Sequence, residues 1–174
     1  MNLLAEPAPS FDTPIELLRA CHERILQHCR LLDWLDAQLQ TQAVDPQMQQ
    51  AAARIHRYFT LSGPPHHADE ELQLFPWLLT HKDLPETTRT AILELTEQHA
   101  LLDACWATLA EQLCQIRDGH FSDSSLRKQD FVDLSRQHVQ RENDQIFSVA
   151  SQLLDQETAQ VLGAKMVERR RAHP

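Results

Sequence analysis

Apolar residues recur every three or four positions through four long stretches of this chain, and this spacing restricts each stretch to a helix. The first stretch carries its apolar residues at Ile15, Leu18, Ile25, Cys29, Leu32, Leu35 and Leu39. Such spacing gathers the apolar side chains on one face of a helix. Only 3 of the 174 residues are glycine, the residue that, after proline, most weakens a helix interior. We therefore predict an all-α fold.

Proline and polar clusters separate the predicted helices from one another. Asp45-Pro46 starts the second helix, Leu84-Pro85 precedes the third, and the segment DGHFSDSS precedes the fourth. Within the second helix, Ser62-Gly63-Pro64-Pro65 predicts a kink or a break, because proline lacks the N–H that a helix needs. The helix would then resume at His66 and run to about Thr80.

Four helices joined in this order predict an up-and-down antiparallel four-helix bundle. We assign the bundle to residues 13–155 and a proline-rich N-terminal arm to residues 1–12. Residues 156–174 are expected to form an extra short helix and a tail outside the bundle. A single core of this size needs neither disulfides nor a structural metal to fold.

Charge and composition exclude several classes of protein. The net charge is -9, which makes nucleic acid an improbable partner. No apolar run approaches the roughly 18 residues of a membrane span, and the N-terminus lacks the features of a secretory signal. The four cysteines form no C-x-x-C pair, so they are interpreted as small apolar residues. We expect a cytoplasmic protein without a membrane or nucleic-acid partner, and the tryptophans leave a homodimer open.

Four histidines and two glutamates interrupt the apolar stripes. His22 and His99 each occupy a core position alone, whereas His66-x3-Glu70 and His138-x3-Glu142 form the same pattern on the second and fourth helices. Residues four apart lie on one face of a helix, so each pair can point into a single cavity. Unpaired polar groups would be costly to bury there. Bundles commonly build metal sites from such inward groups.

The donor set favours two iron ions. Imidazole suits iron, zinc, copper or nickel, and carboxylates can bridge two ions. Six donors are too many for tetrahedral zinc, but they suit two six-coordinate irons that each take two histidines and share both glutamates and an oxo or hydroxo bridge. Ferritin-like sites use Glu-x-x-His, and no histidine here has a glutamate three residues before it. A zincin motif is absent as well, because His22-Glu23 has no second histidine at the required spacing.

Four segments resemble the hemerythrin-like (HHE cation-binding) domain family. HHADEELQLFP is similar to its signature and QHVQRENDQIF to a second copy, and CHERIL and EQHALL extend the resemblance over residues 14–155. The resemblance implies a four-helix bundle with a di-iron centre. It implies as metal ligands the residues that the spacing had selected: His22, His66, Glu70, His99, His138 and Glu142.

One departure from the family bears on function. Oxygen-carrying hemerythrins have a fifth histidine on the third helix, four residues from another, whereas Leu95 and Asp103 flank His99 at that spacing. Asp103 could be a further ligand or a hydrogen-bond acceptor for one. His67 lies about 100° from His66 around the helix and is expected beside the site or at the surface rather than as a ligand.

Without the family's fifth histidine, a position on the metal would be left open to a small molecule. This open position predicts binding or sensing of oxygen, nitric oxide or hydrogen peroxide. Two alternatives remain. One is an enzyme of oxidative or nitrosative defence, or an iron donor for the repair of iron-sulfur clusters. The other is a bundle whose metal serves only structure.

Overall fold

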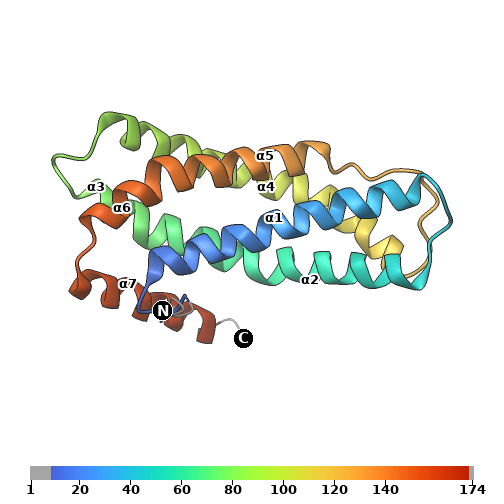
Figure 1. The fold of residues 1–174 in the computed structure, drawn as a ribbon, viewed down its shortest axis with the longest axis horizontal. Helices are drawn as coiled ribbons and strands as arrows, with labels where there is room; N and C mark the ends of the chain where they lie inside the picture. Colours follow the sequence, from blue (N-terminus) through green and yellow to red (C-terminus); the bar gives the residue numbers. More distant parts are fainter. Residues whose placement is uncertain (1–8, 173–174) are drawn as a thin grey trace, which may run out of the picture.

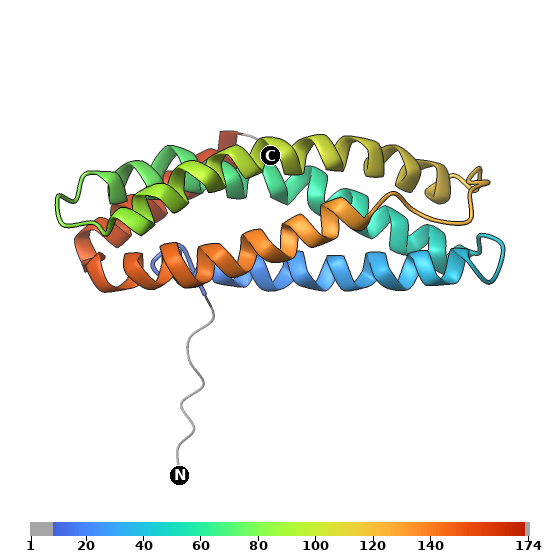
Figure 2. The same cartoon turned by 90° about the horizontal axis from the view of Figure 1, so that it is seen from above.

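The computed structural model describes residues 9–172, and they form a bundle of long antiparallel helices (Figures 1 and 2). The first hairpin consists of α1 (Pro14–Leu39) and α2 (Pro46–Asp69), and α2 continues through a π-helical segment, η1 (Glu70–Leu74), into α3 (Phe75–Leu79). The second hairpin consists of α4 (Glu86–Arg117) and α5 (Gln129–Arg141), and α5 continues through η2 (Glu142–Phe147) into α6 (Ser148–Leu153). The predicted all-α class is confirmed.

Prolines mark the starts of α1, α2 and α4, although no side chain caps α1. Pro14 and Pro46 occupy the first turns of α1 and α2, where the missing N–H costs nothing. Asp45 caps α2, because its side chain accepts a hydrogen bond of 2.8 Å from the backbone N–H of Met48. α4 begins directly after Pro85. These local signals therefore determine where the helices that carry the polar residues begin.

Of the predicted kink or break at residues 62–65, the break is wrong. α2 runs through Pro64 and Pro65 without a break, and the α-helical pattern changes only at Glu70. Gly63 explains part of this result, since it has no Cβ to clash with the ring of the following proline. The carbonyls left without a donor belong to Thr60 and Leu61, which lie in an exposed turn where water can hydrate them. The glycine-proline sequence here permits a helix rather than ending one.

The apolar core is divided into two clusters along the bundle. One lies toward the α1–α2 turn and includes Leu35, Ile55 and Phe131, whereas the other lies toward α3 and includes Leu18, Leu78 and Phe147. The six polar residues predicted as ligands belong to neither cluster, although all six are buried. The polar centre is thus closed by apolar side chains at both ends.

The extra helix, α7 (Gln156–Ala172), crosses the outside of the bundle near the start of α1 (Figure 1). Its buried Leu162 and Met166 face inward. Arg169 and Arg170 form ion pairs with Asp69, a fully buried residue of α2. α7 is therefore held to the residue that directly precedes Glu70. Of the predicted N-terminal arm, residues 1–8 lie outside the described part of the chain.

Within residues 9–172, no helix combines the length and the apolar character needed to cross a bilayer.

Candidate metal centre

Each of the four long helices brings one of the predicted histidines to the middle of the bundle. His22 lies on α1, His66 on α2, His99 on α4 and His138 on α5, and none is more than 3% exposed. Glu70 and Glu142 are fully buried between them. The structure therefore brings all six predicted residues together.

Both glutamates stand at the start of a π-helical segment. η1 begins at Glu70 and η2 at Glu142, so the repeat seen in the sequence is also a repeat of backbone geometry. A π turn accommodates one more residue than an α turn, and such turns are frequent at functional sites. At the end of each segment two successive side chains are buried: Leu74 with the following Phe75, and Ile146 with Phe147. The π turn lets the helix place a carboxylate inward and then return an apolar face to the core.

Each carboxylate spans the two halves of the site. Glu70 Oε1 lies 3.4 Å from His66 Nε2 and 3.8 Å from His22 Nε2, whereas its Oε2 lies 3.6 Å from His99 Nε2. Glu142 Oε2 lies 3.0 Å from His22 Nε2 and 3.3 Å from His138 Nε2. Adjacent donors around an ion with bonds of about 2.1 Å are about 3 Å apart. The spacing would let each carboxylate share a metal ion with histidines of more than one helix.

Two groups of donor atoms result from this arrangement. His22, His66, Glu70 and Glu142 form the first, and His67, His99 and His138 form the second, with all donor atoms of a group within 4.8 Å of one another. His67 was expected at the margin of the site, and its half-buried ring stacks on His99 at 3.9 Å between centroids. A fifth imidazole is thus present, supplied by α2. Asp103 belongs to neither group and is exposed.

Three polar residues orient the histidines from outside. The Nδ1 atom of His22 lies 3.0 Å from Asn143 Oδ1, that of His99 lies 2.5 Å from Glu71 Oε1, and that of His138 lies 3.1 Å from Gln98 Oε1. An Nδ1–H that donates to such an acceptor leaves the Nε2 lone pair free to face the centre. The orientation is the one that metal-binding histidines require.

The sequence placed Glu71, like His67, beside the site or at the surface, and it did not single out Gln98 or Asn143. Each is the immediate neighbour in sequence of a predicted ligand: Glu71 follows Glu70, Gln98 precedes His99, and Asn143 follows Glu142. A neighbour is rotated by about 100° around its own helix, and it therefore points at the histidine of an adjacent helix rather than at the centre. That rotation is the signal from which they could have been found.

Several buried polar atoms of the centre lack hydrogen-bond partners within the described residues. They are both carboxylate oxygens of Glu70 and of Glu142, both ring nitrogens of His66, and Nε2 of His22. Buried polar atoms in folded proteins nearly always have partners, so a cluster of unpaired ones calls for a ligand. All of these atoms are electron-pair donors or can become so. The donor set therefore fits metal ions.

The pKa values of the two glutamates also indicate that the centre suits metal ions. Burial, with the nearby carboxylates of Glu142 and Asp69, raises the pKa of Glu70 well above its ordinary value. Burial would also raise the pKa of Glu142, but His138 and His22 beside it hold that pKa well below its ordinary value. Two adjacent buried carboxylates do not both ionise without cations between them. A pair of metal ions would supply that charge.

Comparison with known proteins agrees with this geometry. Residues 13–150 match the family model described as the hemerythrin HHE cation binding domain. A protein of Haemophilus influenzae described as uncharacterized is 41% identical over 108 residues, which is 60% of this chain and 59% of that protein. The chain thus spans less than two thirds of that relative's length. The match covers all four helices and every residue of the centre, and metal binding in this family typically involves iron. The chain belongs to the hemerythrin HHE cation-binding family.

Proposed function

We propose that this protein holds two iron ions in its bundle and binds a small oxidant there: oxygen, nitric oxide or a peroxide. His22 and His66 would hold one ion, His99 and His138 the other, and Glu70 and Glu142 would bridge them. The observation that carries the proposal is the pair of buried carboxylates that span both halves of the site without a hydrogen-bond partner among the described residues. The free thiols of all four cysteines accord with our expectation of a cytoplasmic protein.

An iron pair would supply redox and Lewis-acid chemistry toward such a ligand. The protein's part is positioning and exclusion of water. Glu71, Gln98 and Asn143 lie within hydrogen-bond distance of the Nδ1 atoms of three histidines, where each can accept an Nδ1–H and so keep the Nε2 atom directed inward. The two apolar clusters shield the centre from solvent along the bundle axis, which strengthens every electrostatic interaction inside it.

Anaerobic reconstitution with ferrous iron tests the proposal. We expect two irons per chain, coupled iron signals in Mössbauer spectra, and new charge-transfer or nitrosyl absorption after exposure to oxygen or nitric oxide. Substitution of His66→Ala or His138→Ala should lower the iron content. His120→Ala is the matched control, because His120 is exposed and belongs to neither group of donor atoms.

The possible results separate the alternatives. Two irons that remain spectroscopically unchanged by oxygen, nitric oxide and peroxide would argue for a purely structural metal. Retention of two irons in both histidine variants would refute the ligand assignment. Turnover of a peroxide or of nitric oxide with a reductant would identify an enzyme rather than a sensor.

A further inference from the structure

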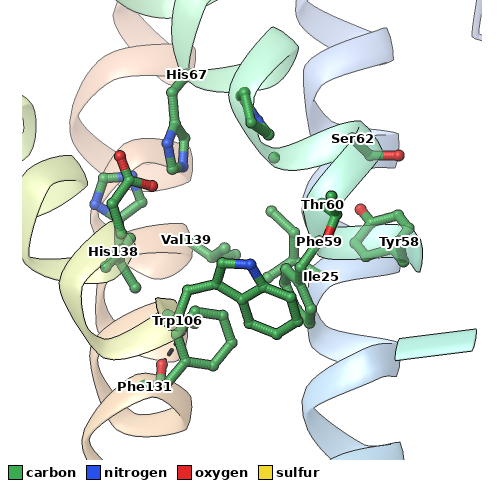
Figure 3. Close-up of a pocket in the computed structure, with 15 residues that line it drawn as sticks. Ile25, Tyr58, Phe59, Thr60, Ser62, His67, Trp106, Phe131, His138 and Val139 are labelled. Atoms are coloured by element: carbon green, nitrogen blue, oxygen red, sulfur yellow. Dashed lines mark hydrogen bonds between the residues drawn. The ribbon is translucent and has the colours of Figure 1, made fainter. Parts of the chain in front are cut away.

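A pocket of about 220 Å³ adjoins the second group of histidines. Helices α1, α2, α4 and α5 all contribute to its wall. Figure 3 shows His67 pointing into the space opposite the indole of Trp106, with His138 beside it. The pocket therefore ends at the second group of histidines, where the half-buried ring of His67 forms part of its wall.

The volume of the pocket exceeds what a small oxidant needs. One water molecule occupies about 30 Å³ of liquid, and oxygen, nitric oxide and hydrogen peroxide are of similar size. An engineered cavity of about 150 Å³ in another protein accommodates benzene. A pocket of about 220 Å³ is thus suited to an organic molecule with a substituted benzene ring or a branched alkyl group.

The wall of the pocket is apolar and aromatic away from the histidines. Phe59, Trp106 and Phe131 pack on one another with centroid distances of 4.9 to 5.6 Å. Two hydroxyl groups in the wall already donate hydrogen bonds elsewhere: Tyr58 to the carbonyl of Cys21, and Ser135 to the carbonyl of Phe131. A ligand would therefore meet apolar surface over most of its length.

The polar groups of the pocket suit an uncharged head group. His67, His138 and the carboxylate of Asp103 lie in its wall, whereas none of the described residues lining it is lysine or arginine. In the pocket wall itself a carboxylate or phosphate would meet no counter-charge, and Asp103 would repel it. At the metal ions, Glu70 and Glu142 already supply negative charge. A neutral group that donates one hydrogen bond can be accepted by imidazole or by carboxylate.

We propose that this pocket binds a neutral aryl or branched-alkyl hydroperoxide, with its hydroperoxy group toward His67 and the metal centre. The proposal rests on the proposed function, because it names the peroxide that the centre would meet. The organic body occupies the aromatic end, and the O–H donates to His67 or Asp103. Hydrogen peroxide would fit, but it has no organic group whose contact with the apolar wall would increase its affinity.

Calorimetric titration of the zinc-loaded protein tests the pocket without redox chemistry, since zinc is redox-inactive. The probes are cumene hydroperoxide, cumene, 4-isopropylbenzoate and hydrogen peroxide. We expect saturable binding of cumene hydroperoxide at least tenfold tighter than that of cumene, which lacks the head group, or of the anionic benzoate. Absence of saturable binding, or tighter binding of the benzoate, would overturn the proposal.

Variants that narrow the pocket locate the binding. Ile25→Phe reduces the space from α1, and Thr60→Phe does so from an exposed position of α2 that tolerates a larger side chain. Each should weaken binding of cumene hydroperoxide at least tenfold. Leu93→Phe, at a position 64% exposed on α4 and outside the pocket, should have no effect. Wild-type affinity in both narrowed variants would place any binding elsewhere and overturn the proposal.

Metal analysis of the same samples separates this proposal from the proposed function. A protein that takes up no metal but binds the hydroperoxide would refute the metal centre and support the pocket. A protein that takes up two metal ions but binds no hydroperoxide would support the metal centre and refute the pocket proposal.

Discussion

The ion pairs that fasten α7 to α2 provide the sharpest test of how the fold supports the centre. Asp69 is fully buried, and Arg169 and Arg170 reach it from α7 with side chains 15% and 31% exposed. Replacing both arginines by methionine keeps much of their apolar length but leaves a buried carboxylate next to that of Glu70. Removal of one partner of a buried ion pair costs about 3–5 kcal/mol.

The partial exposure of the arginines places the expected loss near the lower limit, about 3 kcal/mol in the free energy of unfolding. For a chain of this size each kcal/mol corresponds to about 2–4 °C in melting temperature, so we expect a decrease of about 6–12 °C. Urea unfolding of the metal-free protein would measure the loss. Arg171→Met is the matched control, because Arg171 is exposed on the same helix.

A further substitution distinguishes the charge from the packing. Adding Asp69→Asn to the double arginine variant removes the uncompensated charge, so at least about half of the lost stability should return. The reasoning is refuted if the double variant loses no more than the Arg171→Met control. It is equally refuted if Asp69→Asn lowers the stability of the double variant further.

Three other predictions follow from single positions. Gly163→Ala should cost about 1–3 kcal/mol in urea unfolding, because its Cβ would lie 1.7 Å from the carbonyl oxygen of Phe11 and force the two segments apart; unchanged stability would contradict that contact. Pro64→Ala should raise the free energy of unfolding by about 1–3 kcal/mol, since it restores a helical N–H in α2, and a loss would contradict our description of the exposed turn. Burial lowers the pKa of His67 to about 3 and that of His99 to about 4, below the ordinary 6.5. Between those values the unfolded chain binds more protons than the folded chain, so the stability of the metal-free protein should fall as the pH is lowered from 7 to 4, and His67→Phe should reduce that slope.

The spacing of apolar residues along the helices was sufficient to predict the four-helix bundle and most of the candidate site. It placed His22 and His99 on core faces, and the repeated His-x3-Glu pattern placed the remaining four residues, because a face of a helix follows from spacing alone. The π-helical turns at Glu70 and Glu142 could not be predicted in this way. An extra residue in a turn is stabilised by packing against other helices, which local spacing does not describe.

His67 and Asp103 show the limit of the same reasoning. A rotation of about 100° from His66 suggested a marginal place for His67, yet the ring stacks on His99 of the neighbouring helix. Asp103 lies one turn from His99, as its spacing requires, but on an exposed part of α4 that borders the pocket. In both cases the distance between helices, rather than the angle around one helix, decides what a side chain touches.

The matching halves of the centre have a consequence for how it can change. Each hairpin contributes a lone histidine and a His-x3-Glu pair, so the chain resembles the two subunits of a symmetric dimer joined end to end. The connection keeps the halves together at an effective concentration of about millimolar, whatever the dilution of the protein. It also lets one half accept a substitution that the other need not share. His67 follows the histidine of the first half where Val139 follows that of the second, and both line the pocket. A true dimer would carry the same residue on both sides, whereas the joined chain can give the two halves of its centre different neighbours.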